Sequence, residues 1–220
     1  MPLKRSLTPL EARVLGVLVE KQHTVPDSYP LSLNALTLGC NQKTARDPVI
    51  NATEAEVLQA IDGLKEQSLV NEVSGSRVVR FEHNAARAIG VPSQSVALLT
   101  LLMLRGPQTA AELRLHTERL HRFADISSVE AFLDEMAEHD PPFVVKLPRS
   151  AGEREARWAH LLCGEVAMPP VSASSSLGSA GVAPSEFEAL KAEQARMAGE
   201  IAELRALVTR MARELGIEEG

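Results

Sequence analysis

Hydrophobic and polar positions along the chain repeat one arrangement of elements twice. In each copy, three segments with apolar residues at helical spacing precede two short strand-like runs joined by a turn that contains glycine. Three of the helical segments begin with a threonine followed three residues later by a glutamate, which is the pattern of a capping box. These pairs are Thr8 with Glu11, Thr53 with Glu56, and Thr109 with Glu112.

The repeated pattern predicts a mostly helical α+β protein with small β-hairpins. In the first copy we expect helices that begin at Thr8, Ser32 and Thr53, then strands over residues 69–73 and 77–81. In the second copy we expect a helix over residues 95–104, a helix capped by Thr109, a helix capped by Ser127 or Ser128, and strands over residues 143–147 and 156–162. The first copy also carries extra residues around Pro26 to Pro30, where a loop is predicted.

Three helices followed by a hairpin are the layout of a winged helix, a relative of the helix-turn-helix. The sequence therefore predicts two tandem winged-helix domains, over residues 1–88 and 89–165. Residues 166–184 contain no charged residue and are rich in Ser, Ala, Gly and Pro, which predicts a flexible linker.

Apolar residues after the linker alternate by three and four positions, which is a heptad repeat over residues 185–216. We expect a helix that forms a parallel homodimeric coiled coil. A helix that folds back on its own domains, or one that frays in the monomer, is the alternative. The residues predicted for the dimer interface are Leu190, Met197, Ile201, Leu204, Val208 and Met211.

Composition narrows the class of protein. The chain has 220 residues, of which 45% are hydrophobic, and its net charge is -6. The negative charge argues against a general polyanion binder, and an aromatic content of 3% is too low for a base-stacking platform. The two cysteines lie far apart and are expected to be reduced thiols. Because neither a signal-peptide pattern nor a long apolar stretch is found, we expect a cytoplasmic protein.

Sequence motifs give no support for catalysis. The chain has no phosphate-binding glycine loop, no GxSxG motif and no cysteine beside a plausible histidine partner. His116 and His121 are five residues apart, so they do not share a helix face as a metal-binding pair would. We therefore expect a protein that is not an enzyme and that has no metal, cofactor or small-molecule substrate.

The charge on the third helix of each copy helps to distinguish a protein-binding function from a DNA-binding one. Residues 53–67 carry four acids and one lysine, a net charge of -3, and residues 127–139 carry four acids and no lysine or arginine, a net charge of -4. Such helices would repel the DNA backbone, so we favour a protein-binding regulatory scaffold. The alternative is a DNA-binding transcriptional regulator that uses its wings and the 41–46 segment. The candidate contacts to a protein partner or to nucleic acid are Asn41, Gln42, Lys43, Arg46, Arg77 and Arg80.

One stretch of the first copy carries a specific family signature. It consists of Glu20-Lys21-Gln22, Pro26, Tyr29-Pro30-Leu31-Ser32-Leu33-Asn34, Cys40-Asn41-Gln42-Lys43 and Arg46-Asp47-Pro48. This signature resembles that of the bacterial YceH family, a family of unknown function, and the resemblance covers roughly residues 6–165. It implies a tandem winged-helix fold, but it carries over no activity, cofactor or catalytic residue.

Two explanations of the signature remain open. Arg46 could form an ion pair with Asp47 or with Glu20 and so hold the long loop in place. Alternatively, the polar residues from Asn41 to Arg46 could form a recognition patch whose amide and cationic donors bind a phosphate, a base edge or an acidic peptide.

Overall fold

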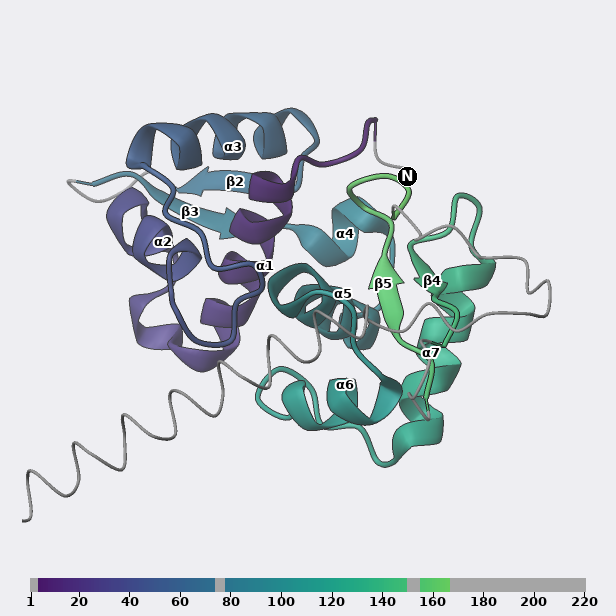
Figure 1. Cartoon of the computed structure of the whole chain (residues 1–220). Helices are drawn as coiled ribbons and strands as arrows, with labels where there is room; N and C mark the ends of the chain where they lie inside the picture. The colour runs from purple at the N-terminus through teal and green to yellow at the C-terminus, as the bar shows by residue number, and fades with distance from the viewer. Residues whose placement is uncertain (1–3, 74–77, 150–154, 167–220) are drawn as a thin grey trace, which may run out of the picture. The chain divides into compact units, whose positions relative to one another are not determined.

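Figure 1 shows the computed structural model, which describes residues 4–73, 78–149 and 155–166. About half of these residues are helical, and the strands form two small antiparallel sheets. All of them belong to the first of two units, Met1–Pro169 and Pro170–Gly220. The predicted heptad helix and nearly all of the predicted linker lie outside the described residues. No helix within the described ranges has the length and apolar composition that crossing a membrane requires.

The first half of the described chain contains a three-stranded sheet and its helices. Its elements are α1 Pro9–Thr24, the 3-10 helix η1 Pro26–Ser28, β1 Leu31–Ser32, α2 Leu33–Cys40, α3 Glu54–Glu66, β2 Val70–Val73, β3 Arg80–His83 and α4 Ala85–Ile89. The strand order is β1-β3-β2, with Leu31 opposite Phe81 and Val70 opposite His83. The sequence pattern predicts neither β1 nor α4, since both are too short to show a period.

The second half repeats the order of three helices and a hairpin. Its elements are α5 Ser93–Arg105, α6 Ala110–His116, α7 Ile126–Glu138, β4 Val144–Lys146 and β5 Trp158–His160. The hairpin pairs Val144 with His160 and Lys146 with Trp158. The backbone of Gln108, just before α6, forms two hydrogen bonds with Trp158, so the start of α6 is fixed to β5.

Helix starts follow the capping signals closely. Complete capping boxes are present at Thr8, Thr53 and Thr109, as predicted. The prediction for α7 is wrong, because Asp125 caps this helix and its Oδ1 accepts a hydrogen bond from the backbone N–H of Ser128 at 2.7 Å. An aspartate caps as well as a serine does, and its charge also favours the positive end of the helix dipole.

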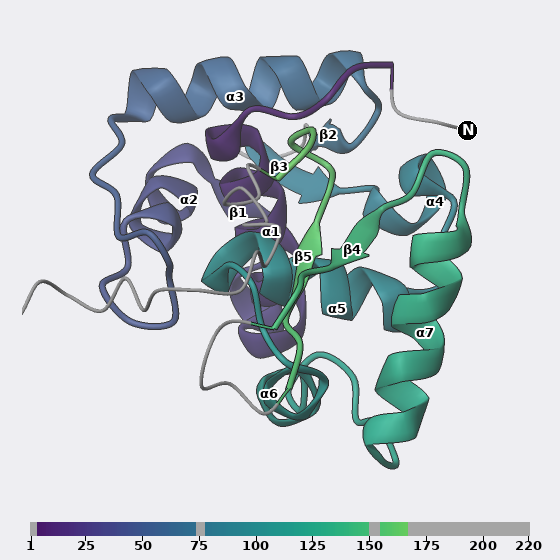
Figure 2. The ribbon, with the colours of Figure 1, turned by 45° about the vertical axis from the view of Figure 1, so that its right-hand side comes forward.

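The core is organised around α1 and α5, which pack against each other (Figure 2). Every residue of α1 from Glu11 to Val19 is buried, whereas the sequence pattern predicts only one buried stripe. The reason is that α2 and α3 cover one side of α1 and α5 covers the other. A Cβ at Gly16 would lie 2.9 Å from Leu104 Cδ2, so the glycine permits the close approach of the two helices. The domain boundary at residues 88 and 89 stays a prediction.

Candidate functional site

Two arginines meet at the C-terminal end of α2. Arg46, in the loop after α2, donates from Nε to the carbonyl oxygen of Gly39 at 3.1 Å. Arg13, on α1, donates from Nη1 to the carbonyl oxygen of Cys40 at 3.1 Å. The last carbonyls of a helix lack partners within it and form the negative end of its dipole, so both cations are favourably placed.

Arg46 is enclosed by partners. We call Glu20, Lys21, Gln42 and Arg46 the Arg46 cluster. The Arg46 side chain is 0% exposed, and Nη1 and Nη2 donate to the Glu20 carboxylate at 3.1 and 2.6 Å. The same two nitrogens also donate to the carbonyl of Ala45 at 2.8 Å and to Gln42 Oε1 at 2.7 Å. With the bond from Nε to α2, all five N–H donors of the guanidinium are engaged.

Electrostatics within the Arg46 cluster keep its carboxylate charged. Burial raises the pKa of Glu20, but the hydrogen bonds and charge of Arg46 outweigh burial and hold the pKa below its ordinary value. Lys21 adds to this effect, with its Nζ 3.4 Å from the carboxylate. The ion pair between Arg46 and Glu20, which the sequence offers as one explanation of the signature, is therefore present.

Asn41 and Lys43 have contrasting positions in the loop that follows α2. The Asn41 side chain donates to the carbonyl of Ala52 and accepts from the Ala52 N–H, both at 2.8 Å. This pair of bonds closes the loop between residues 41 and 52. Lys43 is exposed to solvent. Of the candidate contacts in this loop, Asn41, Gln42 and Arg46 therefore form internal bonds, and Lys43 faces water.

The remaining candidate contacts do not join this group. Arg80 on β3 donates from Nη1 to the carbonyl of Pro30 at 2.7 Å and so binds the segment before β1. Arg77 lies outside the described residues. The predicted dimer-interface residues also lie outside them, namely Leu190, Met197, Ile201, Leu204, Val208 and Met211. The structure thus joins Gln42 to Arg46 and attaches Arg80 to a different segment.

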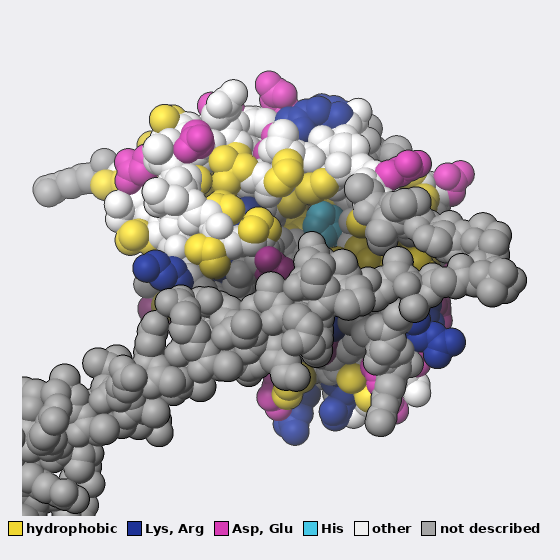
Figure 3. Space-filling model, in the orientation of Figure 1, with side chains coloured by type: hydrophobic (Ala, Val, Ile, Leu, Met, Phe, Trp, Pro, Cys, Tyr) yellow, Lys and Arg dark blue, Asp and Glu magenta, His cyan; other side chains and the backbone are white. Residues whose placement is uncertain are grey.

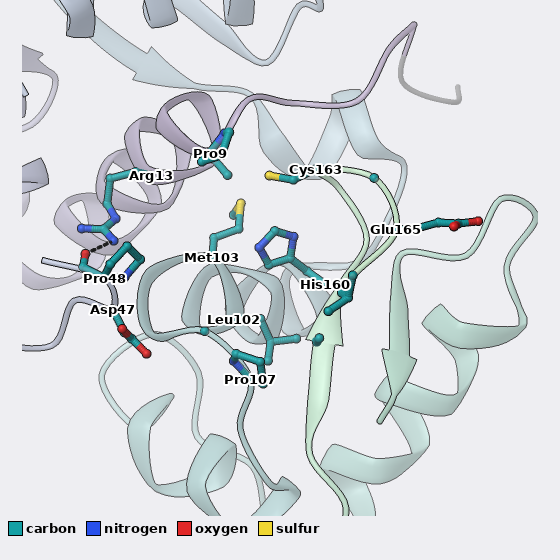
Figure 4. Close-up of a pocket in the computed structure, with 15 residues that line it drawn as sticks. Pro9, Arg13, Asp47, Pro48, Leu102, Met103, Pro107, His160, Cys163 and Glu165 are labelled. Carbon is teal, nitrogen blue, oxygen red and sulfur yellow. Dashed lines mark hydrogen bonds between the residues drawn. The ribbon is translucent and has the colours of Figure 1, made fainter. Parts of the chain in front are cut away.

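A pocket of about 300 Å³ opens beside Arg13 (Figure 4). We call it the Arg13 pocket, and its lining consists of Pro9, Ala12, Arg13, Asp47, Pro48, Leu102, Met103, Gly106, Pro107, Ala159, His160 and residues 163–166. Its walls come from α1, α5 and β5 and from the segments that follow α2, α5 and β5. The volume is at the lower end of the range for small-molecule sites.

Apolar surface continues beyond the Arg13 pocket. A neighbouring pocket of about 310 Å³ shares Pro9, Arg13 and Pro48 with it and extends to Ile50 and Ala52. Figure 3 shows hydrophobic side chains gathered over α1, between α3 and α5. Arg13 therefore borders two hollows in a largely apolar face.

Arg13 differs from Arg46 in its incomplete set of partners. It is 3% exposed, and its second hydrogen bond runs from Nη2 to the carbonyl of Pro48 at 2.7 Å (Figure 4). Its Nε is buried without a hydrogen bond, and no ion pair among the described residues includes this arginine. Burial lowers the pKa of Arg13, the charge of Arg46 lowers it further, and Cys40 and Asp47 oppose this shift. The pocket wall thus holds a buried cation that forms no ion pair with any residue that the structure describes.

His160 and Cys163 line the opposite side of the Arg13 pocket. Nδ1 of His160 is buried without a hydrogen bond, and burial lowers the pKa of His160 to about 4, so its ring is neutral at neutral pH. Burial raises the pKa of Cys163 to about 11, and its Sγ donates to the carbonyl of Thr8 at 3.7 Å. A protonated thiol is a weak nucleophile. These groups are better suited to lining a binding site than to nucleophilic attack.

Metal-binding geometry is also missing from the part of the chain that the structure describes. No group of three or more His, Cys, Asp or Glu side chains in these ranges is placed to hold a metal ion. The polar groups of the Arg13 pocket are thus not arranged around a metal site, and they can contact a ligand directly.

Sequence reasoning does not identify Arg13 or His160. The available signal is a charged residue next to the apolar positions Leu10 and Val14 on α1. In an amphipathic helix such a residue ordinarily faces solvent, but here Arg13 is buried where α1 meets the end of α2 and Pro48, to whose carbonyls it donates.

Comparisons with known proteins agree with a bacterial family. Residues 7–153 match the family model described as "Protein of unknown function, DUF480". The chain is 68% identical over 219 residues to a UPF0502 protein of Burkholderia pseudomallei strain 668, an alignment that covers 100% of this chain and 93% of the relative. It is 69% identical over 217 residues to a UPF0502 protein of Burkholderia thailandensis, covering 99% of this chain and 92% of the relative.

Proposed function

The chain belongs to the DUF480 family of proteins of unknown function, and from its own residues we propose that it is a non-enzymatic tandem winged-helix module that binds another protein as a regulatory scaffold. The resemblance of its signature to the YceH family stays a prediction. The proposal places the protein in the cytoplasm as a homodimer held through residues 185–216. Two copies of one binding surface would raise the effective concentration of that surface for a partner.

The order of elements supports the winged-helix part of the proposal. Helices α1, α2 and α3 precede the β2–β3 hairpin, and helices α5, α6 and α7 precede the β4–β5 hairpin. In helix-turn-helix relatives, the recognition helix enters the major groove of DNA and needs donors for bases and phosphates. In this arrangement the corresponding helices are α3 and α7.

The observation that carries the protein-binding proposal is the charge on these two helices. All of their acidic side chains are exposed, and these are Glu54, Glu56, Asp62, Glu66, Glu130, Asp134, Glu135 and Glu138. The single cation of α3, Lys65, is paired with Glu72 at 2.8 Å and with Asp62 at 3.8 Å. Both helices would therefore repel phosphates rather than neutralise them.

A second candidate function, a DNA-binding transcriptional regulator, is favoured by other exposed cations. Lys43 is exposed in the loop after α2, and Arg119 and Arg122 are exposed between α6 and α7. These residues could contact phosphates without the third helices. Arg46 contributes less to this candidate function than the sequence suggests, because its donors are all engaged.

Binding to random-sequence duplex DNA distinguishes the two functions. Fluorescence anisotropy is measured at about 50 and about 200 mM salt, a range over which phosphate contacts weaken strongly. We expect no binding by the wild type and a gain of binding by the double variant Glu54→Lys/Asp62→Lys, which reverses charge on α3. Salt-sensitive binding by the wild type that drops in Arg119→Ala/Arg122→Ala would instead establish the DNA function.

Affinity capture then tests the protein function directly. We expect wild-type protein to retain a partner from a lysate of the native organism. The same partner should be lost with Glu54→Lys/Asp62→Lys or with Glu130→Lys/Asp134→Lys. Asp27→Lys serves as the matched control, because it makes the same charge reversal at an exposed acid outside both helices.

A further inference from the structure

We propose that the Arg13 pocket binds a small organic carboxylate, with its apolar body against α5 and β5 and its carboxylate on the guanidinium of Arg13. This inference goes beyond the proposed function, because it assigns a small-molecule site that the exposed faces of α3 and α7 do not contain.

The first argument is the incomplete set of partners around Arg13. Its side chain is 3% exposed, its Nε is buried without a hydrogen bond, and it makes two hydrogen bonds, both to neutral backbone carbonyls. A buried charge is stable when it is paired, and hydrogen bonds between a guanidinium and a carboxylate are among the strongest in proteins. Because Nε is enclosed, an anion would bind through the N–H groups that Nη1 and Nη2 do not use in these two hydrogen bonds, and it would act as the counter-ion of Arg13.

The second argument is the composition of the walls. Leu102 and Met103 of α5 and Ala159 of β5 give the pocket an apolar side, and the neutral ring of His160 adds no charge to it. A single available cation next to apolar walls suits a monoanion with a hydrocarbon body better than a highly charged phosphate. The volume of about 300 Å³ admits a small ligand.

Two carboxylates at the edge of the pocket would repel a bound anion. Asp47 and Glu165 are both exposed, whereas Arg13 is buried. Water and salt screen exposed charges far more than buried ones, so the attraction to Arg13 outweighs the repulsion from the edge. The same reasoning predicts that Asp47→Asn increases the affinity for a carboxylate severalfold.

The position of the pocket suggests what occupancy would do. Its walls include α1 from the first half of the described chain and α5 and β5 from the second half. The buried residues of these elements belong to one core. A bound carboxylate would contact both halves and would stabilise their packing against each other.

Binding of three matched probes to the full-length protein tests the proposal. Hexanoate, hexanamide and hexylamine share one hydrocarbon chain and differ in the charge of the head group, and binding is followed by two-dimensional NMR of the amides. We expect saturable shifts with hexanoate, and an affinity for the other two that is lower by about tenfold or more. Equal affinity for all three probes, or no binding of hexanoate, butyrate or benzoate, would overturn the proposal.

Two variants place the binding in the pocket. Arg13→Met should reduce hexanoate affinity by about tenfold or more, since it removes the charged donors. Ala159→Leu should also reduce it while keeping Arg13, and this variant tests the site if Arg13→Met fails to fold. Arg87→Ala is the control, because it removes an exposed charge on α4 that does not line the pocket, and it should bind hexanoate as the wild type does. Hexanoate binding that survives both pocket variants would refute the site, whatever the DNA and partner experiments show.

Discussion

Arg46 and Arg13 donate hydrogen bonds to the same end of α2, and they lie in surroundings of opposite character. Arg46 has all five donors engaged and a carboxylate partner, whereas Arg13 has two bonds to carbonyls, a buried Nε without a partner, and a pocket beside it. Burial of a cation therefore does not by itself indicate its role. The complete set of partners around Arg46 is typical of a structural role, and the incomplete set around Arg13 beside a pocket is the observation behind the proposed carboxylate site.

Helix geometry explains why the two arginines differ. Glu20 lies seven residues after Arg13 on α1, which puts both on the same side of the helix but about two turns, or roughly 10 Å, apart. The carboxylate is therefore out of reach of Arg13. The loop after α2 carries Arg46 to the position beside Glu20, so the acid of α1 pairs with the loop and not with its neighbour on the helix.

Removing Arg46 should have the largest effect on the stability of the protein. Arg46→Met should lower the free energy of unfolding by about 3–5 kcal/mol, because Glu20 is left as a partly buried carboxylate without its partner. Urea unfolding measures this loss. Lys43→Ala should change stability by less than about 0.5 kcal/mol, as expected for an exposed side chain. A loss below about 1 kcal/mol for Arg46→Met would show that the cluster is not a structural centre.

As the pH falls, the contribution of His160 in the Arg13 pocket to the folding stability should be lost before that of Glu20 in the Arg46 cluster. The pKa of His160 is about 4 in the folded protein against an ordinary 6.5, so the unfolded chain takes up its proton first. The stability from the neutral ring is complete above pH 6.5 and is lost as the pH falls toward 4, with a loss of about 2 kcal/mol by about pH 5. Glu20, whose pKa is lowered, stays charged through this interval and loses its contribution only below its ordinary value of 4.5.

Urea unfolding at neutral pH and at about pH 5 checks this expectation. His160→Gln should flatten part of the pH dependence. His83, whose pKa burial lowers to about 4, should account for a similar remaining part. A His160→Gln variant that keeps the full pH dependence would contradict the assignment to His160.

Removing Arg13 should lower the stability much less than removing Arg46 does. Arg13→Met should cost about 1 kcal/mol, because two hydrogen bonds to carbonyls are lost while an unpaired buried charge is removed at the same time. Urea unfolding next to Arg46→Met makes the comparison direct. A loss as large as that of Arg46→Met would mean that Arg13 is a second structural centre, and the contrast between the two arginines would fail.

Local chemistry made much of the fold predictable. The capping boxes at Thr8, Thr53 and Thr109 mark three helix starts correctly, because a cap depends on residues only three positions apart. The second strand of the first hairpin was predicted over residues 77–81 and lies at Arg80–His83. The position of β3 depends on its pairing with both β1 and β2. The local pattern of residues carries no information about this pairing.

The candidate site was predictable only in part. The signature loop pointed to Arg46, Gln42 and the pair with Glu20, because charged residues at fixed places suggested an ion pair. Arg13 and His160 gave no such signal, since they come from α1 and β5 and meet only around the pocket.

Residue identity and local spacing alone determined the order of three helices and a hairpin in each half, the acidic character of α3 and α7, and the membership in a family. The tertiary structure alone decided that α1 is enclosed between α2, α3 and α5, that Arg46 takes the carboxylate of α1, and that Arg13 is left buried beside a pocket. The physical reason is that burial and ion pairing depend on distances between segments far apart in the chain, which are set only when the helices pack.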